Sequence, residues 1–168
     1  GGYSAVFAAA NANNTGLTVS HSTLFGNSYA GIQLLGGNNG ATIAGNTVFG
    51  VRGSSSNLQH LGIQADGNDI VITQNTVYDA ETTGIQALGA RATISDNHVY
   101  SSGTGIYVTN GGGFSQSFAP TLRSFVQDNV VHDNISGINA SGTVVVSGNT
   151  VYGHRDLFGN AIGVSTGD

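Results

Sequence analysis

The stretch ATISDNHVYSSGTGIYV, residues Ala92–Val108, contains the plan that most of the chain repeats. It holds an apolar-x-apolar pair, an asparagine three residues later, an aliphatic and an aromatic residue, a variable loop, and Gly-Ile-x-aliphatic. A repeat of this length indicates a solenoid, in which each unit buries its apolar face against its neighbours. Five further segments follow the plan: Leu17–Leu34, Ala41–Ala65, Ile70–Ala87, Ser124–Ala140 and Val144–Val164.

Within one unit, apolar residues alternate with polar ones, and β-branched residues are common. This periodicity of two predicts short β-strands. Because the connections are not two-residue hairpins, we expect the chain to wind so that equivalent strands stack in parallel, about 4.8 Å apart. Helical repeats do not fit, since Gly and Asn recur inside every unit and both are poor helix formers. The sequence predicts one all-β domain over residues 1–168, with about six coils of three short strands each.

An asparagine marks the same point of nearly every unit. At a tight bend between two strands, an inward asparagine tolerates the backbone conformation and bonds nearby free backbone groups. Stacked asparagines also bond one another along the axis. We therefore expect an Asn ladder along one corner of the solenoid. Its members are Asn46, Asn75, Asn97, Asn129 and Asn149, with Ser22 in the first unit.

This pattern resembles the right-handed parallel β-helix repeat of pectate-lyase-like proteins. The resemblance rests on Asn46–Phe49 and Asn75–Tyr78, each followed by a Gly-Ile pair, and it extends over essentially the whole chain. Asp128–Asn134 is similar in style to the repeats of alginate epimerases and lyases. The resemblance implies a single-stranded right-handed parallel β-helix. It leaves the activity open, because that fold hosts lyases, epimerases, hydrolases, adhesins and phage spikes.

The composition argues against several classes of function. Only 8% of the 168 residues are charged, the formal net charge is −5, and the chain has no lysine and no cysteine. Four scattered arginines cannot form the basic stripe that nucleic acid binding needs. No apolar run is long enough to span a membrane. We expect an extracellular or cell-surface location, and we interpret the chain as a piece of a longer one whose open coils could stack on flanking domains or on another copy.

The outward positions of the Gly-Ile-x-aliphatic strands form the candidate binding surface. In the resembled enzymes, the saccharide cleft runs along this face. Amides bond hydroxyl groups in pairs and an aromatic ring stacks on a sugar ring, so such a row suits a polysaccharide. The alternative is a row that only stabilises the stack. The residues are Gln33, Gln64, Gln86, Tyr107 and Asn139.

Two long insertions flank the same strands. Gly50–Leu61 precedes one of them and Thr109–Arg123 follows another. We expect these loops to form walls beside the row. They add Arg52, His60 and Arg123 to the candidate substrate-binding residues.

The sequence assigns no catalytic residue and no metal ligand. Proton abstraction beside a uronate carboxylate needs a base, usually with a cation, and the outward row holds no acid. Asp66–Asp69 lacks the loop of an EF-hand calcium site and is interpreted as a turn with side-chain bonds. No cofactor is therefore assigned, and Ca²⁺ stays an alternative that no motif supports.

Aromatic rings recur three residues after the corner asparagine, and this column is interpreted as packing. His98 stands in an outward row of threonines and is interpreted as simply exposed. The ring column is Phe25, Phe49, Tyr78, Tyr100, His132 and Tyr152.

We thus predict an extracellular β-helix module with a structural or polysaccharide-binding role, and we favour a non-catalytic function. One alternative is a fragment or relative of a polysaccharide lyase or C5-epimerase that acts on uronic-acid polymers. A second alternative is an adhesin or fibre module that stacks end to end.

Overall fold

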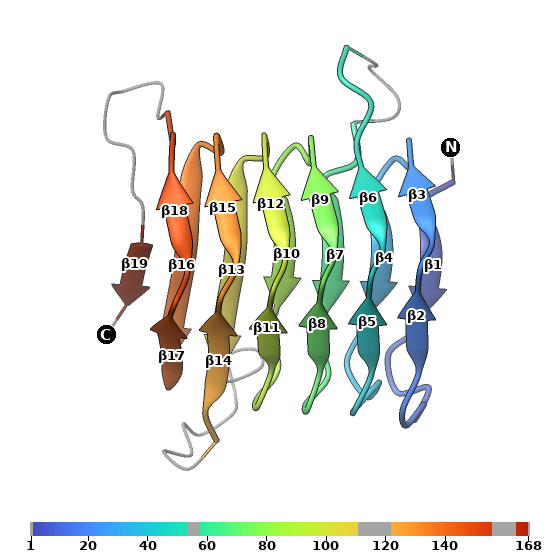
Figure 1. Ribbon diagram of the computed structural model, residues 1–168. Coiled ribbons are helices and arrows are strands. Elements are labelled where there is room, and N and C mark those ends of the chain that lie inside the picture. Colours follow the sequence, from blue (N-terminus) through green and yellow to red (C-terminus); the bar gives the residue numbers. More distant parts are fainter. Residues whose placement is uncertain (1, 54–57, 111–121, 156–163, 168) are drawn as a thin grey trace.

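The computed structural model describes residues 2–53, 58–110, 122–155 and 164–167. The regular secondary structure in these ranges consists of β-strands alone, and all strand pairings are parallel. The strands form three sheets along one axis, as predicted for a parallel β-helix. In Figure 1, two of these sheets run upward, one above the other, in the nearer layer, and the third runs downward behind them, while the chain advances from right to left. The winding is therefore right-handed.

Each sheet collects one strand from every coil. Sheet A contains β1 (Ser4–Ala8), β4 (Ala30–Leu34), β7 (Leu61–Ala65), β10 (Thr83–Ala87), β13 (Thr104–Asn110), β16 (Ser136–Gly142) and β19 (Val164–Gly167). Sheet B contains β2 (Thr18–Ser20), β5 (Thr42–Ala44), β8 (Val71–Thr73), β11 (Thr93–Ser95), β14 (Ser124–Gln127) and β17 (Val144–Ser147). Sheet C contains β3 (Thr23–Phe25), β6 (Thr47–Phe49), β9 (Thr76–Tyr78), β12 (His98–Tyr100), β15 (Val130–His132) and β18 (Thr150–Tyr152).

The core is a continuous file of aliphatic side chains inside the coil. In the three-residue strands of sheets B and C only the middle side chain points inward, as Ile94 and Val99 do. Sheet A contributes more to each coil, for example Ile106 and Val108 from β13. These side chains are fully buried, and burial of each aliphatic contributes about 1.5–3 kcal/mol. Stacking the coils makes this core continuous.

The corner between sheets B and C carries the repeated asparagines. Asn75 donates from Nδ2 to Oδ1 of Asn97 at 3.0 Å and to the carbonyls of Ile43 and Thr73 at 2.9 Å. The residue before each asparagine turns the chain with a positive φ, for example 56° at Gln74. The amide thus satisfies backbone groups that this bend leaves without a strand partner. The same Nδ2-to-Oδ1 bond joins Asn46 to Asn75, Asn97 to Asn129, and Asn129 to Asn149.

The glycine of each Gly-Ile pair has a packing reason. A Cβ on Gly84 would lie 2.5 Å from Cγ1 of Val99, the inward valine of the same coil. The corresponding distance is 2.4 Å for Gly62 against Val77. Such contacts are far inside van der Waals range, so only a hydrogen atom fits where sheet A begins.

The aromatic column lies on the outer face of sheet C. Its neighbouring rings are nearly parallel, with centroids 4.8–5.2 Å apart. This spacing follows from the distance between stacked strands, because one ring stands on each coil.

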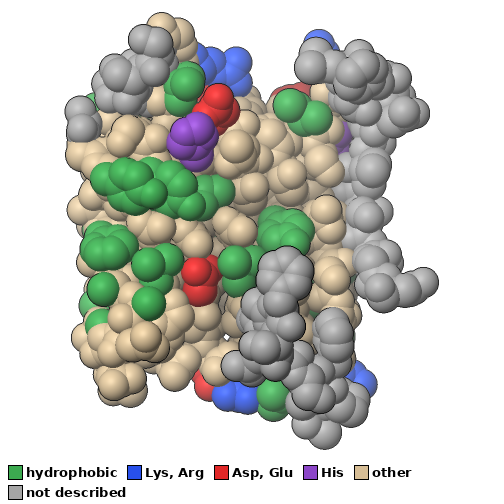
Figure 2. All heavy atoms as spheres, turned by 180° about the vertical axis from the view of Figure 1, so that it is seen from behind, with side chains coloured by type: hydrophobic (Ala, Val, Ile, Leu, Met, Phe, Trp, Pro, Cys, Tyr) green, Lys and Arg blue, Asp and Glu red, His purple; other side chains and the backbone are tan. Residues whose placement is uncertain are grey.

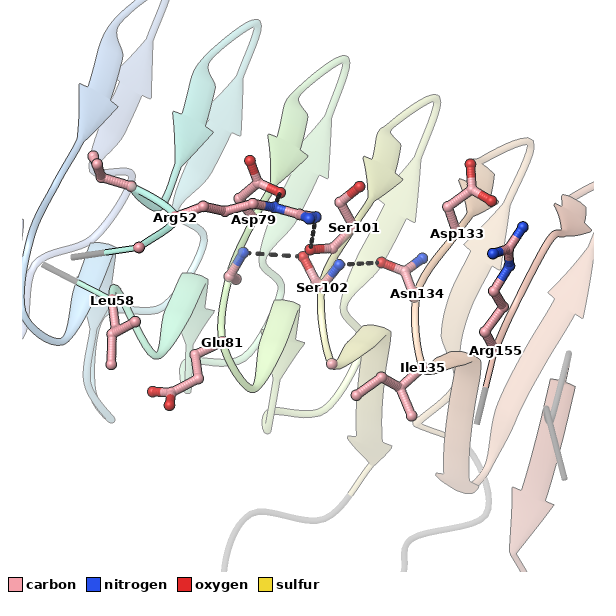
Figure 3. Close-up of a pocket in the computed structure, with 14 residues that line it drawn as sticks. Arg52, Leu58, Asp79, Glu81, Ser101, Ser102, Asp133, Asn134, Ile135 and Arg155 are labelled. Carbon is pink, nitrogen blue, oxygen red and sulfur yellow. Dashed lines mark hydrogen bonds and ion pairs between the residues drawn. The ribbon is translucent and has the colours of Figure 1, made fainter. Parts of the chain in front are cut away.

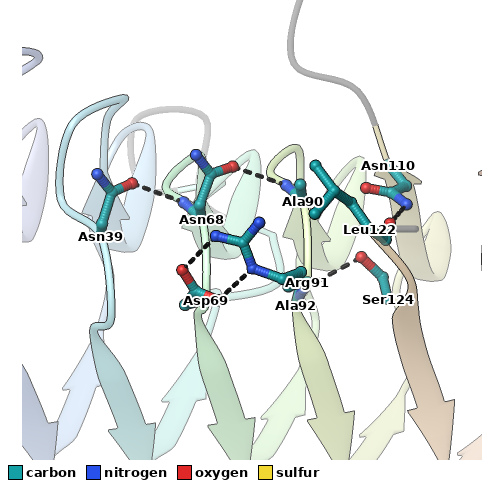
Figure 4. A network of polar contacts seen from close by, with 9 residues as sticks. All are labelled: Asn39, Asn68, Asp69, Ala90, Arg91, Ala92, Asn110, Leu122 and Ser124. Carbon is teal, nitrogen blue, oxygen red and sulfur yellow. Dashed lines mark hydrogen bonds and ion pairs between the residues drawn. The ribbon is translucent and has the colours of Figure 1, made fainter. Parts of the chain in front are cut away.

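The corner between sheets A and B is closed by turn bonds (Figure 4). Oδ1 of Asn68 accepts from the backbone amide of Ala90 at 2.9 Å. Arg91 pairs with Asp69 at 2.5 Å, and this bond holds the pKa of Asp69 below its ordinary value. Within the described residues, no helix is long and apolar enough to cross a membrane.

Candidate functional site

The five outward residues predicted as a binding row do lie in one line. Gln64 is in register with Gln33 on one side and Gln86 on the other, and Tyr107 pairs with both Gln86 and Asn139. The row therefore crosses sheet A at one residue per coil, on the face that Figure 2 shows.

The first half of the row is occupied by its own hydrogen bonds. Ser4 donates to Oε1 of Gln33 at 3.0 Å, and Nε2 of Gln33 donates to Oε1 of Gln64 at 3.1 Å. Gln64 donates in turn to Oδ2 of Asp66 at 2.9 Å. Only 5% of Gln33 and 8% of Gln64 are exposed. These two amides are committed to one another and offer little to a ligand.

The second half of the row differs. Gln86, Tyr107 and Asn139 are partly exposed, and within the described residues no side-chain hydrogen bond joins them. They present two amides and a phenol at successive coils. Among the described residues, no side-chain partner occupies their donors and acceptors, so these groups can meet a ligand that runs along the axis.

Asp66 stands where these halves meet, and its role differs from the turn residue that the sequence suggested. Oδ1 is buried and has no partner among the described residues, while Oδ2 accepts from Gln64. Burial raises the pKa of this carboxyl to about 6, against the opposing effect of the Gln64 bond. The available signal was strand alternation, because Asp66 stands two residues after the outward Gln64.

Two of the three loop residues lie at one corner and the third at another. Nε of Arg52 pairs with Asp79 at 2.5 Å, and Nδ1 of His60 lies 2.6 Å from Glu81. Both pairs flank the corner where sheet C leads into sheet A. Arg123 immediately precedes β14, so it lies beyond the other end of the sheet A strands. Residues 54–57 and 111–121 of the two loops lie outside the described residues.

Beside the row, a short aromatic stack adds exposed apolar surface. Tyr3 and Tyr29 are parallel with ring centroids 4.7 Å apart, and the His60 ring lies 6.2 Å from Tyr29. Figure 2 shows a band of hydrophobic side chains on this face, next to a histidine and an acidic side chain.

A groove of about 400 Å³ lies at the corner between sheets C and A (Figure 3). Arg52 and Arg155 lie in its lining, together with the acids Asp79, Glu81 and Asp133. Leu58 and Ile135 add apolar surface to it. The groove therefore offers both donors and acceptors, and of these Arg52 and Asp79 pair with each other, while Glu81 pairs with His60 and Asp133 with His132.

Beneath the groove lies a second column of buried side chains, which differ from coil to coil. Nδ2 of Asn27 donates to Oε1 of Gln59 at 3.3 Å, and the amide of Ala80 donates to Oγ of Ser102 at 3.2 Å. Oδ1 of Asn134 accepts from the Ser102 amide at 2.8 Å. The sequence did not reveal this column because its residue type is not repeated.

Two histidines that the sequence treated separately meet on sheet C. Nε2 of His98 lies 2.7 Å from Nε2 of His132, whose Nδ1 lies 2.8 Å from Oδ2 of Asp133. Burial, and to a lesser extent His132, lower the pKa of His98. The signal was weak, since the two residues are 34 positions apart.

Comparison with known proteins gives one family. Residues 3–116, more than half of the chain, match the family model described as periplasmic copper-binding protein (NosD). Neither the curated proteins nor the solved structures contain a match.

Copper can be tested against the donor set of this chain. Imidazole, thiolate and thioether are its usual ligands, and the sequence has no Cys and no Met. In the part of the chain that the structure describes, no three side chains of His, Cys, Asp or Glu converge on one metal position. A copper centre with three or more such ligands therefore does not fit these residues, although two imidazoles, His98 and His132, do come together.

Proposed function

The chain belongs to the NosD family of periplasmic β-helix proteins, and we propose that it is a module outside the cytoplasm that binds polysaccharide along the outer face of sheet A. The observation that supports this is the second half of the row. Gln86, Tyr107 and Asn139 stand in register, one per coil, and no side-chain hydrogen bond within the described residues occupies their polar groups.

The spacing of this row suits a linear polymer of repeating units. Successive coils are about 4.8 Å apart, which is close to the length of one pyranose unit in an extended chain. Gln86 and Asn139 each offer a donor and an acceptor to vicinal hydroxyls. Tyr107, between them, offers a ring face. Three adjacent coils would thus contact about three sugar units.

Asp66 lies beside this row and can discriminate among sugars by its charge. Its Oδ1 is buried and its Oδ2 accepts from Gln64, so it acts on a bound glycan through its electrostatic field, and a uronate would place a second carboxylate near it. Like charges at short distance repel when both are ionised. We therefore expect neutral glycans to bind better than uronans above pH 6, where Asp66 is ionised.

Affinity electrophoresis and calorimetry against soluble neutral glycans and uronans test the proposal. We expect Tyr107→Ala to weaken binding by about 2- to 12-fold, since ring contacts contribute about 0.5–1.5 kcal/mol. Gln86→Ala should weaken it a few-fold, as loss of one neutral hydrogen bond does. The triple variant with Asn139→Ala should show no binding.

Gln127→Ala is the matched control, because it makes the same change on the outer side of sheet B, in register with Ser95. It should bind as the unmodified chain does. If the triple variant retains full affinity, or if no glycan in the panel binds, the proposal is wrong.

A second candidate is a lyase or C5-epimerase that acts on uronic-acid polymers. It is favoured by one observation, the raised pKa of Asp66, since a carboxyl with a pKa of about 6 can exchange a proton near neutral pH. Incubation with alginate and pectate, followed by absorbance of unsaturated ends and by proton NMR, would detect either reaction. Turnover that is lost in Asp66→Asn while binding persists would establish this candidate, and silence across the panel would remove it.

A further inference from the structure

The groove at the corner between sheets C and A contains a notch that is one coil wide. Asp79, Ser101 and Asp133 each follow a residue that is paired in sheet C, so they stand in one row on successive coils. The middle member of this row is a serine between two aspartates. Gly103, which also lines the groove, lies beside Ile135 of the next coil. The coil that holds Ser101 and Gly103 therefore leaves a notch between the larger side chains of its two neighbours.

The fold does not require the small residue at Ser101. Its φ is 57°, and the aspartates at the equivalent positions have φ values of 55° at Asp79 and 53° at Asp133. The backbone therefore accommodates a longer side chain at this point. Gly103 differs, because a Cβ there would lie 2.8 Å from the carbonyl oxygen of Glu81. Half of the notch thus follows from backbone packing, and the other half is a property of this sequence.

The charges that surround the notch nearly cancel. Nη2 of Arg52 donates to the carbonyl of Ser101 at 3.5 Å, so this side chain extends along the groove to the notch. Arg155 lines the groove on the coil beyond Asp133. Three acidic side chains and two arginines line the groove in all. An anionic ligand would meet the three carboxylates, and a cationic ligand would meet the two guanidinium groups.

The two rims of the groove differ in polarity (Figure 3). The row of Asp79, Ser101 and Asp133 forms one rim, and Leu58 and Ile135 lie along the other. Ile135 is 47% exposed, so its apolar surface is accessible to a ligand. A ligand in the notch would therefore contact hydrogen-bonding groups on one side and an aliphatic side chain on the other.

We infer that this groove is a binding site for a short neutral saccharide, with one sugar unit in the notch. A hydroxyl group both donates and accepts, so it satisfies the carboxylates and the guanidinium groups without adding charge. Hydrogen bonds to a carboxylate are charge-assisted and stronger than neutral ones. The groove volume of about 400 Å³ is in the range of small-molecule sites. The groove is separate from the row on sheet A, so the inference does not depend on whether that row binds polysaccharide.

Nuclear magnetic resonance titration of the ¹⁵N-labelled chain tests the inference, with methyl glucoside and cellobiose as neutral probes. We expect both probes to shift the amide signals of Ser101, Ser102 and Gly103. Glucosamine, a cation, and galacturonate, an anion, should bind several-fold more weakly, because each meets like charges in the groove.

The chain offers matched substitutions at the notch. Ser101→Arg fills it, and Arg91 shows that arginine adopts this backbone conformation here, with φ 58°. It should weaken binding by at least about tenfold, because the sugar unit is displaced. Ser101→Gly leaves the notch open and should bind as the unmodified chain does, since Gly153 occupies the equivalent position two coils on. Asp133→Asn should weaken binding a few-fold, because a neutral acceptor replaces a charged one.

Thermal melts verify that each variant remains folded. If Ser101→Arg does not fold, Ile135→Ala at its exposed position decides in its place, with an expected loss of a few-fold. The inference is overturned if no neutral probe shifts the notch signals, or if the shifts fall on Gln86 and Tyr107 of sheet A instead. It is also overturned if the filled notch keeps full affinity, or if either charged sugar binds more tightly than the neutral probes.

Discussion

The two corners of the coil that flank sheet C solve the same problem in different ways. Between sheets B and C, the same asparagine recurs and each Nδ2 bonds the next Oδ1 at 2.8–3.0 Å. Between sheets C and A, the buried positions hold Asn27, Gln59, Ala80, Ser102 and Asn134. The first corner is uniform, whereas the second varies from coil to coil.

The difference shows where this fold has room for function. At the uniform corner every asparagine side chain is hydrogen-bonded to the neighbouring coils, so an inserted residue there would interrupt the ladder of asparagines. At the varied corner the chain can lengthen, as it does before β7, where Gln59 reaches back to Asn27 across the insertion. The groove lies beside this varied corner. The corner whose buried residues vary is thus also the corner where the loops and charged side chains that a ligand could contact are found.

Removing an amide from the uniform corner should have the largest effect. Asn97→Ala loses the bonds to Ile72, Ser95 and Asn129 and leaves the Asn75 amide without its acceptor. We expect a loss of about 3–5 kcal/mol in the free energy of unfolding, measured by urea denaturation. Asn134→Ala, at the varied corner, should cost about half as much, because it makes fewer bonds. Equal losses would contradict the distinction between the corners.

A methyl group at the start of sheet A should have the next largest effect. Gly84→Ala places a Cβ 2.5 Å from Val99, and overpacking of this kind costs about 2–3 kcal/mol. Gly36→Ala is the matched control, since its Cβ would meet nothing within 4 Å. Thermal unfolding of both variants measures the difference, and similar melting temperatures would show that the contact with the valine relaxes without cost.

Asp66 extends the comparison to the corner between sheets A and B. Burial raises its pKa from 3.8 to about 6, so the folded chain holds the proton more tightly than the unfolded chain. Its contribution to stability is therefore full below about pH 4 and is lost as the pH rises through about 6. Allowing for solvent screening, Asp66→Asn should stabilise the chain by about 1–2 kcal/mol at pH 8 and should give no such gain at pH 4. An equal gain at both pH values in chemical denaturation would refute the ionisation argument.

The smallest effect is expected from the ion pair on the rim of the groove. The Arg52 side chain is 69% exposed, so Arg52→Ala should lower stability by less than about 1 kcal/mol despite the short contact with Asp79. Added salt should reduce the difference further. A loss comparable to that of Asn134→Ala, in the same denaturation assay, would mean that the groove surface contributes to folding as much as the column beneath it.

The repeated parts of this structure were predictable and the unrepeated parts were not. Strand positions, the winding and the alignment of Gln64 with Gln86 follow from period-two patterning and fixed spacing. The sequence did not show that the Asp66 side chain is partly buried beside the row and bonded to Gln64, because a turn explained its neighbours Asn68 and Asp69. The pairing of His98 with His132 required knowledge of which residues become diagonal neighbours, and loop lengths between coils obscure that. The sequence likewise could not show that Gln33 would be buried while Gln86 remains accessible.

The ladder of corner asparagines is polar along the axis of the solenoid. Each bond between two corner asparagines runs from the Nδ2 of one to the Oδ1 of the asparagine in the coil that follows, although the same Nδ2 also donates to a carbonyl of the preceding coil. A coil added on the following side would continue the ladder by offering its asparagine Oδ1, while one added on the preceding side would continue it by offering its Nδ2. Lengthening the solenoid by design therefore requires extra coils in the same head-to-tail orientation, because an inverted coil would set donor against donor.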